Sequence, residues 1–184
     1  MQEGETDEYV NVIRAYQQPI YRYCLRLLVN AQDAEDAAQD IFIKAFESIR
    51  HYRRMISFSS WLYTIAYRHC LNLLRKRKYQ LQLLPRLLRT DAAAESPEQS
   101  LDNRLFSPAL TAALAALSPE DRSLLILHIF EERTYAEISE ITGQKPDALK
   151  KRVSRMKEKA RSLIRDWREE EPWNGNNQPV NGNI

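Results

Sequence analysis

Residues 134–164 have the sequence TYAEISEITGQKPDALKKRVSRMKEKARSLI. Residues that typically start or end helices occur inside this stretch and predict how it folds. Thr134 and Glu137 form a capping box, in which each side chain satisfies a backbone N–H at the start of a helix. Gly143 suits the left-handed residue that ends a helix, and Pro146 suits the first position of the next helix. The stretch therefore predicts two helices joined by a tight turn.

The second of these helices has one apolar face and one basic face. Its apolar residues recur with helical spacing and predict a buried stripe: Leu149, Val153, Met156, Ala160 and Leu163. Its basic residues lie away from that stripe: Lys150, Lys151, Arg155, Lys157, Lys159 and Arg161. An ordinary helical hairpin with a solvated basic face would show the same charge. The tight turn and the concentration of charge on one helix favour a DNA-binding helix-turn-helix.

Composition limits the remaining possibilities. The chain has 184 residues, only 4 Gly and no run of alternating apolar residues, so we expect an all-α protein of one or two small domains. No apolar run approaches the roughly 18 residues that cross a membrane. The acidic N-terminus is wrong for a signal peptide, so we expect a cytoplasmic protein in which Cys24 and Cys70 are reduced thiols.

Two helices are expected in the first fifty residues. Apolar residues recur with helical period over residues 9–28, where Pro19 should kink the helix or start a new one. Asp33 is a suitable N-cap for a helix over residues 34–50. That helix should bury six residues: Ala37, Ala38, Ile41, Ala45, Phe46 and Ile49. Its other side shows Glu35, Gln39, Asp40 and Glu47, and from the pattern alone this acidic side is a solvated surface.

A third helix should run from about Ser57–Ser59 to Lys78. Aromatic residues come first (Phe58, Trp61, Tyr63 and Tyr67), and a basic cluster follows (Arg68, Arg75, Lys76, Arg77 and Lys78). Aromatic rings stack on unpaired bases and basic groups bind phosphates, so this segment suits an opened DNA strand. The alternative is that Trp61 and Tyr63 belong to the hydrophobic core.

Three motifs in this order resemble a known family. They are DAEDAAQDIFIKAF (residues 33–46), FSSWLYTIAYRHCLNLLRKRK (residues 58–78) and the helix-turn-helix ending LKKRVSRMKEKARSLI. Together they resemble a bacterial RNA polymerase sigma factor of the extracytoplasmic-function type. The resemblance implies two small helical domains joined by a flexible linker. We expect region 2 over residues 9–80, a linker over 81–110, region 4 over 111–166 and a disordered tail over 167–184.

The resemblance also implies partners and roles. One set of residues would bind the coiled coil of the largest subunit of core RNA polymerase: Asp36, Gln39, Asp40 and Phe42. A second set would bind the melted −10 element of promoter DNA: Arg53, Arg68, Asn72, Arg75 and Lys76. A third set would bind the −35 element in the major groove: Lys150, Lys151, Ser154, Arg155 and Lys157. Further partners would be the polymerase flap and an anti-sigma factor, which in this family is in some cases membrane-anchored.

Arg68 and Asn72 depart from the family pattern, which often has Asn and Asp there, so the −10 base preference of this chain would differ. The linker contains the polar stretch Thr90–Ser100, which we expect to be flexible. Helices should resume over residues 108–117 and 119–131, with Ser118 as the N-cap of the second. His128 there should be half-buried and hydrogen-bonded.

No catalytic, metal or cofactor motif is present. His51, His69 and His128 are isolated, and no Gly-rich phosphate loop or nucleophile motif occurs. We therefore expect a binding protein with no metal, cofactor or small-molecule substrate. Two alternatives are a conventional helix-turn-helix regulator of duplex DNA and a helical adaptor with acidic protein partners. Dependence on polymerase separates the sigma factor from the regulator, and salt-sensitive DNA binding excludes the adaptor.

Overall fold

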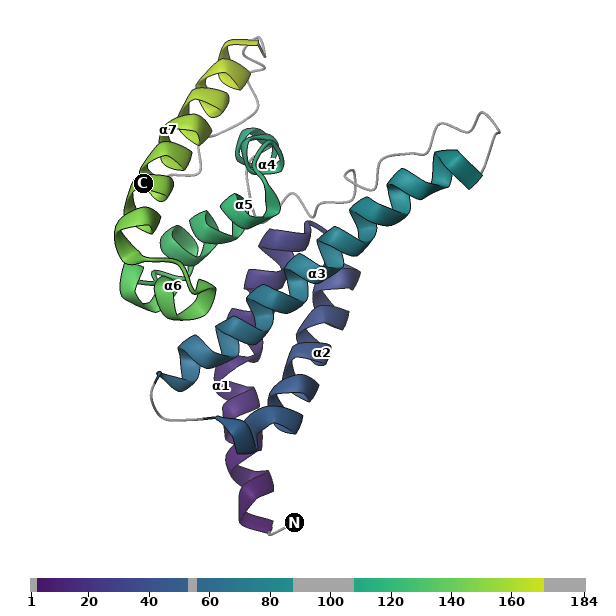
Figure 1. Cartoon of the computed structure of the whole chain (residues 1–184), viewed down its shortest axis with the longest axis vertical. Coiled ribbons are helices and arrows are strands. Elements are labelled where there is room, and N and C mark those ends of the chain that lie inside the picture. The colour runs from purple at the N-terminus through teal and green to yellow at the C-terminus, as the bar shows by residue number, and fades with distance from the viewer. Residues whose placement is uncertain (1–2, 53–55, 88–107, 171–184) are drawn as a thin grey trace, which may run out of the picture.

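The computed structural model describes residues 3–52, 56–87 and 108–170, and every regular element in these ranges is helical (Figure 1). This confirms the all-α prediction. Residues 3–87, the N-terminal module, contain α1 (Glu3–Leu28), α2 (Ala31–Ser48), the short η1 (Ile49–His51) and α3 (Phe58–Leu87). Residues 108–170, the C-terminal module, contain α4 (Pro108–Ala115), α5 (Pro119–Leu125), the π-helical turn η3 (Ile126–Phe130), α6 (Tyr135–Thr142) and α7 (Pro146–Glu170).

In the N-terminal module, α1, α2 and α3 pack side by side (Figure 1). Pro19 lies inside α1 without ending it, so the new helix that Pro19 could have started does not form. Cys24 of α1 and Cys70 of α3 are fully buried free thiols whose sulfur atoms lie 3.6 Å apart. A hydrogen bond to Cys70 and burial both raise the pKa of Cys24, so this thiol stays protonated and unreactive at neutral pH.

The start of α2 corrects the sequence prediction. The N-cap is Asn30, whose side-chain oxygen accepts a hydrogen bond from the backbone N–H of Asp33 at 3.0 Å. The helix therefore begins one turn before the expected position, and Asp33 lies in its first turn. Phe46 was expected in the core but is 44% exposed. At 100° per residue it lies about 140° around the helix from Ile41, which is fully buried.

The long helix α3 passes through the expected end at Lys78 and continues to Leu87. Residues 81–87, expected in the linker, therefore belong to α3. Tyr79 and Leu81 are 63% and 52% exposed there. Arg53, the polar stretch Thr90–Ser100 and tail residues 171–184 lie outside the described residues. Residues 167–170, expected in the tail, belong to α7.

The helix-turn-helix forms as its helix-capping residues predict. The Thr134 hydroxyl accepts a hydrogen bond from the N–H of Glu137 at 3.2 Å, and the Glu137 carboxylate accepts one from the N–H of Thr134 at 2.9 Å. Gly143 ends α6 with φ at 74°, and α7 begins at Pro146. Ser118 caps α5 by accepting from the N–H of Asp121 at 3.1 Å. The capping box, the glycine C-cap and the Ser118 N-cap are therefore confirmed.

The apolar stripe of α7 is also confirmed. Leu149, Val153, Met156 and Ala160 are buried against the rest of the C-terminal module, and Leu163 is half-buried. The buried core runs without interruption from α1 to α7, so the two modules pack together in this structure. None of the helices in the described ranges combines the length and the hydropathy needed to span a membrane.

Candidate functional site

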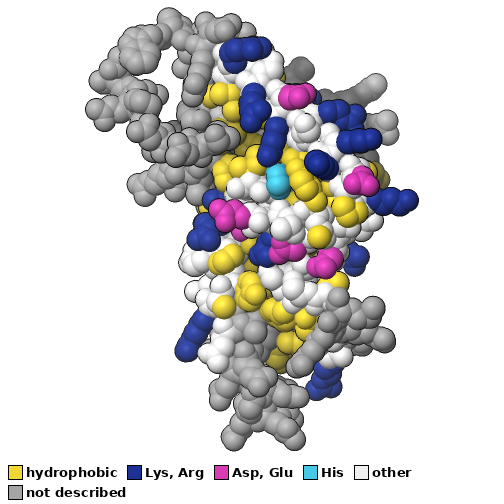
Figure 2. Space-filling view, turned by 90° about the vertical axis from the view of Figure 1, so that its left-hand side faces the viewer, with side chains coloured by type: hydrophobic (Ala, Val, Ile, Leu, Met, Phe, Trp, Pro, Cys, Tyr) yellow, Lys and Arg dark blue, Asp and Glu magenta, His cyan; other side chains and the backbone are white. Residues whose placement is uncertain are grey.

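The basic face of α7 is open to solvent. Lys150, Lys151, Ser154 and Arg155 are exposed, and Lys157 is half-buried. At 100° per residue these five side chains occupy about half of the helix circumference, on the side away from the buried stripe. Figure 2 shows Lys and Arg side chains gathered over the upper part of the face that α7 occupies. The structure thus brings together the five residues predicted to bind the −35 element.

Arg152 lies on the same helix but has a structural role that sequence reasoning missed. Its guanidinium donates to Asp121 of α5 at 2.7 Å and to the Gln144 side chain at 3.0 Å. It therefore holds α7 and the helix-turn-helix turn against α5. A basic residue in a basic cluster carries no sequence signal for this role, because its acidic partner lies far away along the chain.

A second polar face lies on the C-terminal half of α3. Arg68, Asn72, Arg75 and Lys76 are exposed and fall within an arc of roughly 100° around the helix. The structure therefore brings together four of the five residues predicted to bind the −10 element. Arg75 already has a partner, because its guanidinium lies 3.1 Å from a carboxylate oxygen of Glu120 in α5.

The aromatic residues at the start of α3 pack mainly against one another. The rings of Tyr52, Phe58 and Trp61 have centroids 5.2–5.6 Å apart, and Tyr16 approaches Phe58 at 5.7 Å. Phe58 and Trp61 are half-buried, so each ring has some surface exposed. Tyr63 is fully buried, as the core alternative predicted.

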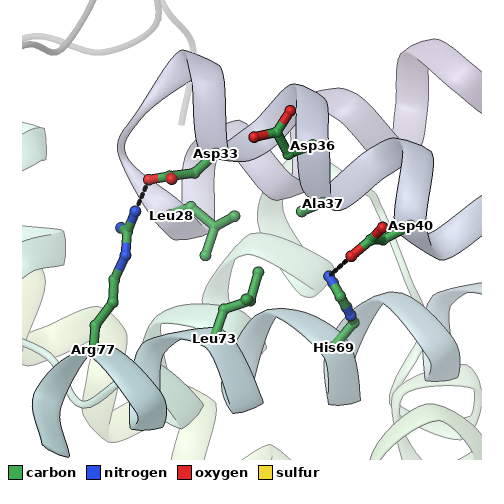
Figure 3. A pocket seen from close by; sticks show the side chains of 8 residues that line it. All are labelled: Leu28, Asp33, Asp36, Ala37, Asp40, His69, Leu73 and Arg77. Atoms are coloured by element: carbon green, nitrogen blue, oxygen red, sulfur yellow. Dashed lines mark hydrogen bonds and ion pairs between the residues drawn. The ribbon is translucent and has the colours of Figure 1, made fainter. Parts of the chain in front are cut away.

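The acidic side of α2 borders a shallow pocket between α2 and α3 (Figure 3). Asp36, Gln39 and Asp40 are exposed, whereas Phe42 is half-buried against the core. The pocket has a volume of about 150 Å³ and lies between two pairs of polar side chains. At one end Arg77 donates to Asp33, and at the other His69 faces Asp40.

His69 leaves the Asp40 carboxylate available. Burial lowers the pKa of His69, the nearby Lys44 ammonium lowers it further, and Asp40 raises it in opposition. With its pKa below the ordinary 6.5, the imidazole is neutral at pH 7. The 3.6 Å between His69 Nε2 and Asp40 Oδ2 is too long for a hydrogen bond. Asp40 therefore presents its carboxylate to solvent.

The other charges near the pocket do not form a metal site. Among the described residues, no group of three or more His, Cys, Asp or Glu side chains is placed to hold a metal ion.

His128, in the C-terminal module, is half-buried, and its Nδ1 lies 3.1 Å from the carbonyl oxygen of Arg133. Its ring stacks on Tyr135 with centroids 4.6 Å apart, so the predicted half-buried, hydrogen-bonded state is confirmed.

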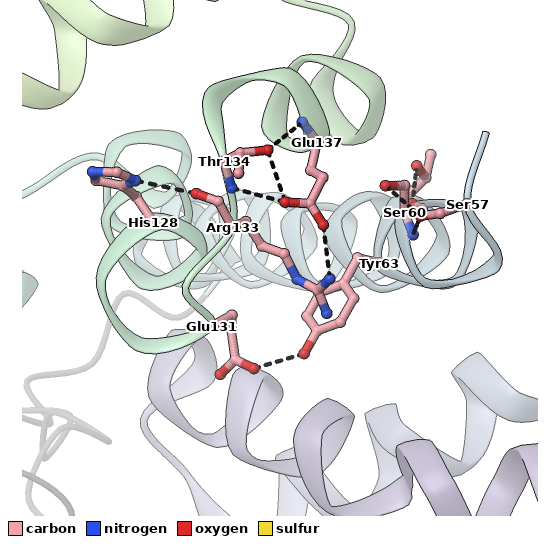
Figure 4. Close-up of polar contacts among 9 residues, drawn as sticks. Ser57, Ser60, Tyr63, His128, Glu131, Arg133, Thr134 and Glu137 are labelled. Atoms are coloured by element: carbon pink, nitrogen blue, oxygen red, sulfur yellow. Dashed lines mark hydrogen bonds and ion pairs between the residues drawn. The ribbon is translucent and has the colours of Figure 1, made fainter.

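A buried polar cluster between the modules was not predicted. Tyr63 of α3 donates to Glu131 at 2.6 Å (Figure 4). Arg26 of α1 donates to the other oxygen of Glu131 at 2.8 Å. Burial, with the hydrogen bond to Glu131, raises the pKa of Tyr63 well above its ordinary value. Tyr63 and Arg26 lie 68 and 105 positions before Glu131 in the chain, so no local pattern could have indicated these contacts.

Family models match both modules. Sigma-70 region 2 matches residues 12–79, and Sigma-70 region 4 matches residues 107–159. The RNA polymerase sigma factor YlaC of Bacillus subtilis is 35% identical over 139 residues, which cover 74% of this chain and 80% of YlaC. The extracytoplasmic-function sigma factor SigW of the same organism is 28% identical over 175 residues, which cover 90% of this chain and 94% of SigW.

A solved structure has the same fold. The sigma factor RpoE of Bartonella quintana, in a complex with the anti-sigma factor NepR, matches with a TM-score of 0.68 and 23% identity. The match covers 86% of this chain and 97% of RpoE. Because both family regions occur in order and a relative is 35% identical over 80% of its own length, this chain belongs to the RNA polymerase sigma factors of the extracytoplasmic-function type.

Proposed function

We propose that this chain binds core RNA polymerase and directs it to promoters by contacting the −10 element with α3 and the −35 element with α7. The observation that supports this most strongly is the presence of both sigma-70 regions in one chain, each with most of its predicted DNA-contact residues exposed on one helix face. In this proposal the chain acts by binding alone, in the cytoplasm, with no cofactor or small-molecule substrate.

The face of α2 that carries Asp36, Gln39 and Asp40 is the proposed polymerase contact. Asp36, Gln39 and Asp40 are exposed, and Ile43 follows them on the same face with 56% exposure. A partner helix with basic residues opposite the two carboxylates and an apolar residue opposite Ile43 would complement this face. The coiled coil of the largest polymerase subunit is the proposed partner, with Phe42 supporting the face from beneath.

The exposed face of α3 is the proposed contact to the melted −10 element. Arg68, Arg75 and Lys76 supply phosphate contacts, and Asn72 can donate to and accept from a base edge. Arg53 is proposed to join them from outside the described residues. The half-buried rings of Phe58 and Trp61 offer surface on which an unpaired base can stack.

The basic face of α7 is the proposed contact to the −35 element. An α-helix fits the major groove of B-DNA, where Lys and Arg can satisfy the two acceptors on a guanine edge. Lys150, Lys151, Arg155 and Lys157 are the proposed basic contacts, and Ser154 adds a hydroxyl between them. The fixed turn at Gly143 sets the angle between α6 and α7, as a helix-turn-helix requires.

An anti-sigma factor is a further proposed partner, membrane-anchored or free, and the polymerase flap is the proposed partner of the C-terminal module. The support for the former is that RpoE of Bartonella quintana, which shares this fold, was solved in complex with the anti-sigma factor NepR. The match of residues 12–79 to sigma-70 region 2 argues against a conventional regulator, which needs only the helix-turn-helix.

The test is the formation of polymerase–promoter complexes. Labelled promoter fragments are mixed with core polymerase, with this chain, or with both, and are then challenged with heparin. We expect heparin-resistant complexes only when both proteins are present. A chain that binds an operator duplex equally well without polymerase would contradict the proposal and support a conventional regulator.

A further inference from the structure

The last turns of α3 extend past α1 and α2, the helices on which the earlier part of α3 packs (Figure 1). Arg77 marks the end of that packing, because its guanidinium donates to Asp33 in the first turn of α2. After it, residues 78–82 are all exposed. Five consecutive residues cover the whole circumference of a helix, so packing within the chain does not account for the side chains of this segment.

Tyr79 is the most exposed of the large hydrophobic side chains in the described ranges. It is 63% exposed, and Leu81 in the same segment is 52% exposed. Single apolar residues on a protein surface are common, and exposure alone does not indicate a binding site. The two residues lie about 160° apart around the helix, so at most one of them can belong to the polar face of α3.

Tyr79 lies on the face of α3 that is proposed to contact the −10 element. At 100° per residue, it falls inside the arc that is formed by Arg68, Asn72, Arg75 and Lys76. Arg75 and Lys76 precede it by four and three residues, so their side chains are its neighbours on the helix surface. An exposed aromatic ring is therefore placed directly beside two cations.

The charge of this face suits a DNA strand. α3 contains no Asp or Glu over its whole length. Arg68 and Tyr79 are eleven residues apart, which is about 16 Å along the helix axis. That length matches about five phosphates at the 3.4 Å spacing of one DNA strand. An acidic protein surface would also complement the charge, but aromatic rings placed among basic groups are typical of sites that bind single strands.

We propose that Tyr79 is a base-stacking residue, whose ring stacks on an unpaired base of the opened DNA strand. This inference deepens the proposed function and rests on it. A phosphate that binds Arg75 or Lys76 brings the attached base next to the Tyr79 ring, and every base has a π face that the ring can cover. Tyr79 then holds the opened strand near one end of α3, and Phe58 and Trp61 hold it near the other.

The experiment uses the full chain bound to core polymerase. The DNA is a promoter fragment from a start site that depends on the chain, with its −10 region already opened by mismatches. The parent chain is compared with Tyr79→Phe, which keeps the ring, and with Tyr79→Leu, which keeps an apolar side chain without the ring. The control is Leu81→Ala, which removes an exposed apolar side chain from the opposite side of the same segment.

Two quantities report on the stack. The first is the affinity of each polymerase complex for the opened fragment. The second is the fluorescence of 2-aminopurine, which replaces each opened base in turn and loses fluorescence when it stacks. We expect Tyr79→Leu to bind the fragment roughly fivefold or more weakly than the parent, because one base–aromatic stack is lost. Tyr79→Phe and Leu81→Ala should bind like the parent.

At one opened position, 2-aminopurine fluorescence should be low with the parent chain and with Tyr79→Phe, and should rise with Tyr79→Leu. Equal affinity of Tyr79→Leu and the parent chain for the opened fragment would overturn the proposal. Fluorescence that is the same in these two proteins at every position would also overturn it.

A protein contact at Tyr79 would give a different result. Tyr79→Leu would then bind core polymerase more weakly in the absence of DNA, and that outcome would replace base stacking with a polymerase contact. Failure of the proposed function is distinguishable, because the parent chain would then form no complex with polymerase and the opened fragment, which overturns both proposals. A complex that the parent chain and Tyr79→Leu form equally well overturns only the stacking role of Tyr79.

Discussion

Tyr23 and Ser123 show how two single residues can join distant parts of the chain. Both side chains are fully buried, and their hydroxyls lie 2.8 Å apart although the residues are 100 positions apart in sequence. Burial raises the pKa of Tyr23 well above its ordinary value, so the phenol stays neutral. Each hydroxyl satisfies the other at a depth where water cannot replace a lost partner.

Removing both hydroxyls should therefore cost less than the sum of the two single removals. We expect Tyr23→Phe and Ser123→Ala each to lower the free energy of unfolding by roughly 1–3 kcal/mol, since each leaves a buried hydroxyl without its partner. The double variant should lose less than the sum of the two. Urea unfolding of the parent chain, the two single variants and the double variant measures this double-mutant cycle. Additive losses would show that the hydroxyls do not interact.

Asp40 offers the most direct residue-level test of the polymerase surface. Its carboxylate is exposed and not hydrogen-bonded to His69, so Asp40→Lys should leave the fold intact. We expect affinity for core polymerase to fall at least roughly tenfold, because the reversed charge would face basic groups of the partner. Fluorescence anisotropy of the labelled chain titrated with core polymerase measures the affinity.

Glu35→Lys is the matched control for Asp40→Lys. Glu35 is exposed on the same helix, about 140° around it from Asp40. Equal losses of affinity in the two variants would mean that overall charge, and not the Asp40 face, determines polymerase binding.

At the scale of the helix, the capping box of α6 should make stability depend on pH. Partial burial would raise the pKa of Glu137, but hydrogen bonds from Thr134 and Arg133 outweigh it, and the pKa lies below its ordinary 4.5. A depressed carboxyl pKa stabilises the fold above the unfolded-state value, and the contribution disappears as pH falls through the folded-state value.

We expect Glu137→Gln to lower the free energy of unfolding at pH 7 by about 1 kcal/mol or less, because Gln keeps the box geometry but loses the charge. The difference between parent and variant should shrink as pH falls below about 4.5. Urea unfolding at several pH values measures both effects. A difference that stays constant with pH would show that the Glu137 charge does not stabilise α6.

The basic face of α7 yields a prediction about how promoter binding depends on salt concentration. We expect Lys151→Ala and Arg155→Ala each to weaken promoter binding by the polymerase complex. A residue that contacts phosphate should also reduce the slope of log affinity against log salt by about 1. Arg161→Ala is the control, because Arg161 is exposed on α7 but lies more than one and a half turns beyond Arg155 along the helix, outside the predicted contact residues. Equal losses of promoter affinity in all three variants would mean that the DNA contact is not on the proposed part of the basic face of α7.

Helix ends were predictable where a local motif defines them. Thr134 with Glu137, Gly143 and Ser118 each act through neighbours within a few residues, so the sequence contains the whole interaction. The start of α2 was wrong because Asn30 and Asp33 are both acceptable caps, and the structure uses Asn30. Helical faces on α2, α3 and α7 were predictable from spacing, although the exposure of Phe46 shows that an apolar side chain next to a buried stripe need not join it.

In the whole molecule, the packing of the two modules could not be predicted from the sequence. Arg26 and Glu131 look like ordinary surface charges in their own helical patterns, and they are buried only because the modules meet. Arg75 and Glu120 also pair across the two modules, although Arg75 stays exposed. Motifs in the sequence therefore indicated what each module contacts, while the arrangement of the modules depends on pairs of residues that no local pattern connects.

The central claim is that this chain gives core RNA polymerase its promoter specificity. The most direct measurement is transcription in vitro from fragmented DNA of the bacterium that encodes the chain, using core polymerase with and without the chain, with transcript 5′ ends mapped. We predict discrete start sites that require the chain and share two sequence elements upstream. Start sites that do not change when the chain is added, together with salt-sensitive duplex binding by the chain alone, would contradict the claim.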